Sequence, residues 1–124
     1  MKVKDKVYRY EIKFDFKSNT VVQKQEEYTV IGVNQDYLCI DDRRFTAIKH
    51  KKSYRGDTDT LFNEVGICDW TDRSYLDYLF GYLYTSTTSK KIAYKRIKKA
   101  LEKHIYNKHG RYCNAISFLE KIEL

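Results

Sequence analysis

Alternating apolar and polar residues near the N-terminus predict a β-hairpin. Over residues 7–16, aromatic or aliphatic side chains occupy the even-numbered positions and charged ones fill most positions between them, which is the two-residue period of a strand with one buried face. Residues 17–19 read Lys-Ser-Asn and indicate a turn, and residues 20–33 predict a second, longer strand. The side chains that we expect to face the core are Tyr10, Ile12 and Phe14.

Shorter apolar runs predict the rest of a sheet. Residues 37–40 and 45–48 flank a polar turn at residues 41–44 and predict a second hairpin. Both of its arms carry apolar residues on each face, which favours a central position in the sheet. Another strand is expected at residues 61–70, followed by a turn at residues 71–74.

Residues 75–85 fit two patterns. Leucines recur there at helical spacing, whereas aromatic side chains alternate as they would in a strand. The aromatic and threonine content favours the strand. An aromatic row at this spacing is usually core, and we expect it to be buried; exposed, it would be a platform on which bases stack. The row is Tyr78, Phe80, Tyr82 and Tyr84.

A basic, amphipathic helix is predicted next. Thr88 or Ser89 can cap its first turn, and Gly110 suits the residue after its end. The apolar face of this helix carries Ala93, Ile97, Ala100, Leu101, His104 and Ile105. The opposite arc carries Lys91, Lys95, Arg96, Lys98, Lys99 and Lys103. A short terminal helix, capped by Asn114, is expected from the spacing of Ala115, Phe118, Leu119 and Ile122.

Strands followed by helices predict the α+β class. We expect an antiparallel meander sheet of five or six strands, packed against a long basic C-terminal helix and a short terminal helix. The 124 residues suffice for one domain, with residues 1–87 mostly β and residues 88–124 helical.

The net charge of +7 is concentrated in the long helix. Residues 1–87 carry fourteen basic and fourteen acidic side chains, whereas residues 88–111 carry nine basic ones and a single acid, Glu102. A concentrated positive face usually has a polyanionic or acidic partner. The alternative is an ordinary solvated helix, but this one lacks the glutamates that normally pair with lysines four residues away.

A second basic group lies in the loop after residue 48. Its aromatic side chain, Tyr54, could stack on a base. If the sheet packs on the helix, this loop and the helix could form one continuous groove. The loop residues expected to bind are Lys49, Lys51, Lys52, Tyr54 and Arg55.

Catalytic chemistry has little support in the sequence. His50, His109 and Asp57 could serve a small nuclease, and Asp57 with Asp59 could hold a divalent metal, although a plain loop accounts for these residues better. His104 falls on the apolar helix face and is expected to be structural. No Gly-rich phosphate loop, nucleophile elbow or zinc motif is present, and the three cysteines are far apart. We therefore expect no enzyme activity, cofactor or metal.

These observations favour a non-enzymatic binding protein. The partner expected is RNA or a nucleic-acid-handling complex, with no membrane partner, and a cytoplasmic location is expected because no signal or transmembrane segment is evident. In size and composition the chain resembles accessory and anti-defence proteins of phages and mobile elements, including anti-CRISPR inhibitors. The alternatives are a protein-binding inhibitor whose lysines meet an acidic patch, and a small nuclease.

Overall fold

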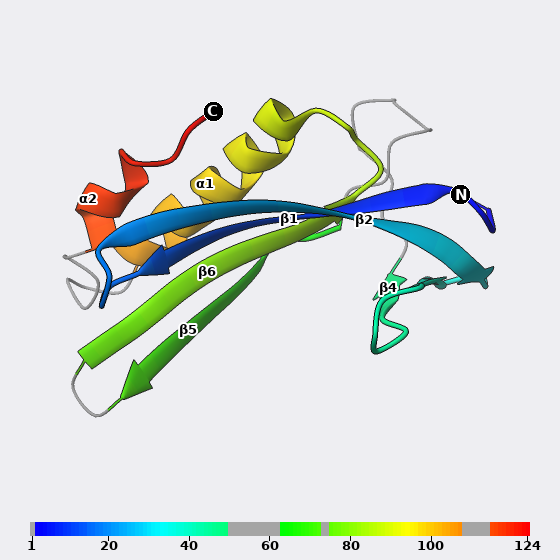
Figure 1. Ribbon diagram of the computed structural model, residues 1–124, viewed down its shortest axis with the longest axis horizontal. Helices are drawn as coiled ribbons and strands as arrows, with labels where there is room; N and C mark the ends of the chain where they lie inside the picture. Colours follow the sequence, from blue (N-terminus) through cyan, green and yellow to red (C-terminus); the bar gives the residue numbers. More distant parts are fainter. Residues whose placement is uncertain (1, 50–62, 73–74, 108–114) are drawn as a thin grey trace.

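The computed structural model describes residues 2–49, 63–72, 75–107 and 115–124 as one curled antiparallel sheet with two helices on one of its faces (Figure 1). This arrangement confirms the α+β class. The strands are β1 (Lys6–Asp15), β2 (Thr20–Val33), β3 (Tyr37–Ile40), β4 (Ala47–Lys49), β5 (Gly66–Asp72) and β6 (Tyr75–Thr85). The helices are α1 (Lys90–Tyr106) and α2 (Ile116–Leu119).

The six strands lie in the order β4-β3-β2-β1-β6-β5, and every neighbouring pair is antiparallel. Strands β1 to β4 follow one another as a meander, as expected. The β5–β6 hairpin departs from that order, because β6 pairs with β1 and the chain therefore crosses from one edge of the sheet to the other. This crossing places β6 in the interior of the sheet, where both of its faces can be used.

The β1–β2 hairpin forms as the sequence predicts. Its turn is closed by Asn19, whose φ of 57° is a conformation that asparagine tolerates well. The Asp15 carboxylate accepts hydrogen bonds from the backbone N–H groups of Lys17 and Ser18. These two contacts hold the pKa of Asp15 below its usual value. The residues expected in the core, Tyr10, Ile12 and Phe14, are all fully buried.

Helix α1 covers the face of β1 and β6 onto which these side chains point. The Ser89 hydroxyl caps it by accepting a hydrogen bond from the N–H of Ile92. Gly81 lets the helix approach β6, since a Cβ atom there would lie 2.8 Å from Cγ2 of Ile97. The helix ends at Tyr106, and the expected end residue, Gly110, lies outside the described residues, as does Asn114. The buried helical side chains are Ala93, Tyr94, Ile97, Leu101, Ile105, Phe118 and Leu119.

A second, smaller core lies on the other face of the sheet. Because side chains alternate along β1, Val7 points away from α1, and the β3–β4 hairpin packs onto it. The register of β2 and β3 shifts between Val30 and Gly32, where β2 curls. This hairpin was expected at the centre of the sheet and instead forms its edge; its apolar residues serve this separate cluster. The cluster comprises Val7, Val30, Leu38, Ile40 and Ile48.

Several strand ends differ from the sequence prediction. Phe45 has a φ of 49° and is 65% exposed, so β4 begins only at Ala47. Residues 63–65 precede β5 and are not part of it. Thr71 and Asp72 were expected in a turn but continue β5 alongside β6.

Candidate nucleic-acid interface

Four exposed lysines form an inclined row on the solvent side of α1, which turns about 40° around the helix axis at each step. They follow one another at four-residue intervals, which places neighbours about 6 Å apart along the helix axis and the ends about 18 Å apart. The lysine row is Lys91, Lys95, Lys99 and Lys103. The two other basic residues expected on this arc, Arg96 and Lys98, are half-buried at its margins.

Nothing within the helix neutralises the lysine row. No ion pair joins Glu102, the only acid of α1, to any of these lysines. The first turn of the helix has no acid and begins with Lys90 and Lys91, although the positive end of the helix dipole favours negative charge there. Like charges four residues apart each cost about 0.2–0.5 kcal/mol. The helix therefore carries a repulsion that an anionic partner would relieve.

The loop residues do not extend this row, as far as the structure describes them. Lys49 is exposed at the end of β4, on the hairpin that folds onto the face of the sheet away from α1. Of the loop candidates the structure therefore places only Lys49, and the groove expected between helix and loop stays a prediction. The other loop candidates, Lys51, Lys52, Tyr54 and Arg55, lie outside the described residues, as do His50, Asp57, Asp59 and His109.

His104 joins α1 to β5. Its Nε2 atom lies 3.6 Å from Oδ2 of Asp69, and both side chains are partly buried between the helix and the strand. Among the described residues, no group of three or more His, Cys, Asp or Glu side chains is arranged to hold a metal ion. This position suits the structural role predicted for His104.

The aromatic row of β6 lies on the face away from α1. Leu79, Gly81 and Leu83 of this strand face α1. The residues between them therefore point to the other side of the sheet. Tyr84 packs against the second core, whereas Tyr78, Phe80 and Tyr82 are half-buried and belong to neither buried cluster. Their expected burial in the core is therefore wrong. The side chains on both faces of β6 are largely apolar, so the position of α1 determines which face is covered.

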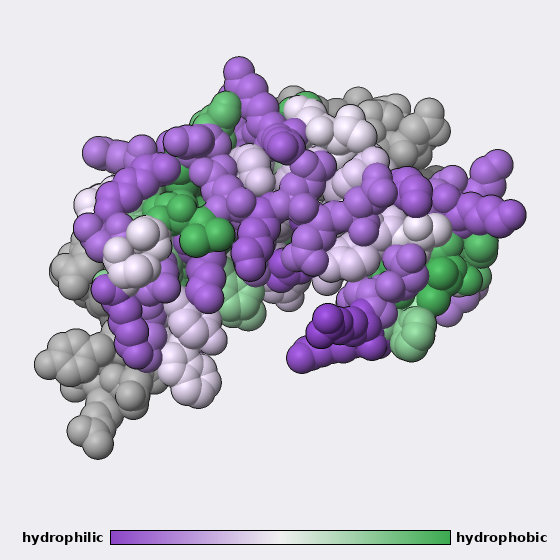
Figure 2. Space-filling view, in the orientation of Figure 1, coloured by the Kyte–Doolittle hydropathy of each residue, from purple (hydrophilic) through white to green (hydrophobic). Residues whose placement is uncertain are grey.

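Cations from β1 lie against this aromatic row. The guanidinium carbon of Arg9 is 5.0 Å from the ring centre of Tyr82 and 5.9 Å from that of Tyr84, and the Lys13 amine is 4.7 Å from that of Tyr78. Trp70 of β5 pairs directly with Tyr78 and is 56% exposed. We call this surface the concave face: Arg9, Lys13, Trp70, Tyr78, Phe80, Tyr82 and Tyr84. Figure 2 shows the molecule hollowed between the β5–β6 end and the β3–β4 hairpin.

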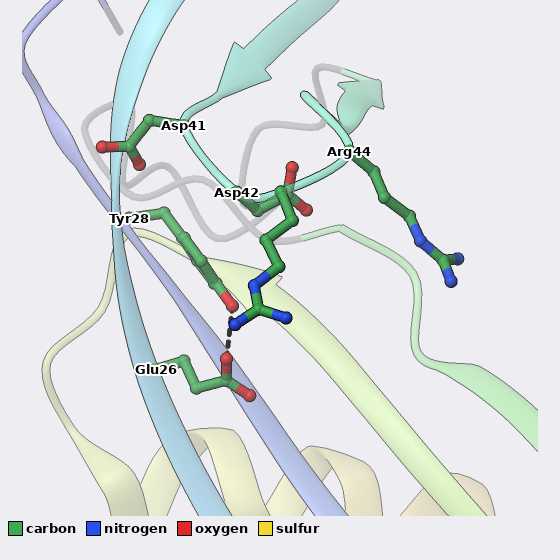
Figure 3. Close-up of a pocket in the computed structure, with 6 residues that line it drawn as sticks. Glu26, Tyr28, Asp41, Asp42 and Arg44 are labelled. Atoms are coloured by element: carbon green, nitrogen blue, oxygen red, sulfur yellow. Dashed lines mark hydrogen bonds between the residues drawn. The ribbon is translucent and has the colours of Figure 1, made fainter.

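A pocket of about 490 Å³ lies near Tyr84, since Tyr28 of its lining and Tyr84 pack against the same second core. Figure 3 shows the residues that line it. The Tyr28 hydroxyl donates a hydrogen bond to the Glu26 carboxylate, and this bond, with partial burial, raises the pKa of Tyr28 to about 12. Asp41 accepts a hydrogen bond from the N–H of Thr29. The residues that line the pocket are Glu26, Tyr28, Asp41, Asp42, Arg43 and Arg44.

Burial opposes ionisation of Asp42 in this pocket, but hydrogen bonds from Thr46 and Arg44 and the charge of Arg44 together outweigh it and lower the Asp42 pKa. Sequence reasoning marked only the turn at residues 41–44. It missed Glu26 and Tyr28, because no local pattern brings the middle of β2 next to that turn.

Comparison with protein-family models, curated proteins and solved structures finds no match to this chain. None of the described helices is long and apolar enough to cross a membrane. The lysine row and the concave face are therefore assigned from their geometry and charge alone.

Proposed function

We propose that this protein binds RNA without catalysing a reaction, and that the lysine row of α1 contacts the phosphates. The observation that carries the proposal is the row itself: Lys91, Lys95, Lys99 and Lys103 are exposed, evenly spaced and without an ion pair among the described residues. Such a row keeps its self-repulsion in the isolated protein and loses it against a polyanion.

The length of the row suits a phosphate backbone. It spans about 18 Å, over which one strand of a duplex carries about five phosphates. Binding releases the counterions condensed on the nucleic acid, and this release drives association at low salt. Contacts of this type carry no sequence information. RNA held within a larger nucleic-acid-handling complex would present the same phosphates to the helix.

The proposal is tested by a salt titration of a triple variant, Lys91→Gln, Lys95→Gln and Lys99→Gln, with a labelled single-stranded RNA of mixed sequence. Each lost phosphate contact reduces the slope of log K against log salt by roughly 0.7, so the variant should flatten it by about two units. The thermal midpoint should not fall, because these side chains face solvent. A matched control replaces Lys2, Lys4 and Lys17, which are exposed and lie off the helix.

Two outcomes would contradict the proposal. Equal flattening by the control variant would show that only net charge matters and that the row is not the site. Failure of the wild type to bind any nucleic acid at low salt would leave the row to an acidic protein partner, as in the inhibitor alternative. Turnover of labelled RNA, measured with and without magnesium, separates binding from the nuclease alternative.

A further inference from the structure

The concave face carries aromatic side chains that lie outside both buried clusters. Tyr78, Phe80 and Tyr82 join neither buried cluster, and Trp70 is 56% exposed beside them. No described helix or strand covers these rings, since α1 and α2 lie on the opposite face (Figure 1). Gathered aromatic side chains of this kind, left partly in water, mark a binding surface.

The spacing of the rings favours separated bases as the ligand. Neighbouring ring centres along β6 are 5.9 Å apart between Tyr78 and Phe80 and 6.2 Å apart between Phe80 and Tyr82. Bases stacked within a duplex lie about 3.4 Å apart and keep their flat faces against one another. The rings can therefore take only bases that are splayed apart, as they are in a single strand.

The charges of the concave face also favour a polyanion. The carboxylates are engaged within the protein: Glu11 lies 3.2 Å from the Arg9 guanidinium, and Glu26 accepts the Tyr28 hydrogen bond. In Figure 3 the Arg44 side chain extends away from the carboxylates of the pocket. Four cations on this face or at its rim make no ion pair among the described residues: Lys13, Lys24, Arg43 and Arg44.

We infer that the concave face is a second binding site, specific for single-stranded nucleic acid. Bases stack on Tyr78, Phe80 and Trp70, while Lys13 attracts the phosphates between them and Arg44 attracts those that reach the Tyr84 end. Such stacking tolerates any sequence, because every base has a flat face. The inference rests on the proposed function for the choice of nucleic acid as partner, and it adds base contact, which the lysine row cannot supply.

The single tryptophan makes this site observable by itself, because Trp70 lies on the concave face. A single strand of about six nucleotides is within the length that one stacking site covers. We expect oligouridylate of this length to quench Trp70 fluorescence, and a short RNA hairpin stem to leave that fluorescence unchanged.

Phe80 offers a matched pair of variants. Phe80→Leu keeps apolar bulk but removes the flat ring, and it should weaken binding of the short strand roughly five- to hundredfold. Phe80→Tyr keeps the ring and should bind like the wild type. Lys13→Gln, which leaves every ring in place, should weaken binding less and reduce its salt dependence. The triple lysine variant of α1 should bind the short strand unchanged.

The outcomes separate the two proposals. If Phe80→Leu binds like the wild type, or if the hairpin stem quenches Trp70 equally well, the stacking site is refuted while the lysine row stands. If the triple lysine variant shows the same salt slope on long RNA as the wild type, while Phe80→Leu still weakens binding of the short strand, the proposed function fails and the stacking site stands. If a protein segment occupies the concave face instead, no oligonucleotide will quench Trp70.

Discussion

The two faces of strands β1 and β6 are built from similar side chains and are put to different uses. On the α1 side, Phe14 and Leu83 are fully buried and pack under the helix. On the other side Phe80 and Tyr82, from the same strand as Leu83, keep contact with water. Burial stabilises an apolar side chain by about 1.5–3 kcal/mol, so the concave face gives up stability that a second helix would supply. This difference indicates that one face is built for packing and the other for binding.

Removal of a phenylalanine from each face should show the largest difference in stability between the two faces. Phe14→Ala should reduce the free energy of unfolding by about 3–5 kcal/mol, since it leaves a cavity under α1. Phe80→Ala removes the same ring from a half-buried site and should cost about 1 kcal/mol. Urea denaturation of both variants provides the measurement. Equal losses would show that the concave face is a core and not a binding surface.

Substitution of Gly81, which lies beneath the helix, tests how closely α1 packs on β6. In Gly81→Ala the added methyl group would lie 2.8 Å from Ile97 Cγ2 and 3.2 Å from Ile67 Cδ1. Overpacking of this kind should destabilise the protein by about 1–3 kcal/mol. The control is Gly32→Ala, where the nearest atom, Cys39 Cβ, is 3.6 Å away and the cost should be close to zero. A Gly81→Ala protein as stable as the control would mean that α1 lies farther from β6.

The packed face could be predicted from the sequence because its signals are local. The alternation in residues 7–16 identifies β1 and its buried side chains, and a cap at Thr88 or Ser89 with apolar residues at helical spacing identifies α1. The lysine row follows from the same helical period. Each of these features depends on residues within one element, so neither sheet order nor curvature is needed to find them.

The concave face could not be predicted because it depends on contacts between distant elements. The aromatic residues of β6 alternate with Leu79 and Leu83, and a two-residue period cannot say which apolar set the helix covers. The pocket requires β3 to pair with β2 so that Ile40 lies opposite Val30, which brings the turn at residues 41–44 beside Tyr28. Apolar residues on both arms of that hairpin indicated a central strand pair, whereas a second core explains them.

The hydrogen bond between Glu26 and Tyr28 at the concave face can be tested by titrating Tyr28. Its hydrogen bond to Glu26, with partial burial, raises its pKa to about 12 in the folded state, above the unperturbed value. Between about pH 10 and pH 12 the unfolded chain has lost this proton and the folded protein has kept it, so stability falls as the pH rises. Glu26→Gln should move the Tyr28 pKa back towards 10, followed by NMR of ring-labelled tyrosine. An unchanged pKa would show that Glu26 is not engaged by this hydroxyl.

In the lysine row, stability and binding should move in opposite directions. Lys95→Glu converts two repulsive four-residue pairs, with Lys91 and with Lys99, into attractive ones. Each conversion is worth about 0.4–1 kcal/mol at low salt, so the thermal midpoint should rise. Binding of long RNA should weaken, because one phosphate contact is replaced by a repulsion. The matched control, Lys2→Glu, changes an exposed lysine off the helix and should leave binding nearly unchanged. A variant that is less stable, or that binds RNA as well as the wild type, would mean that the row is an ordinary solvated surface.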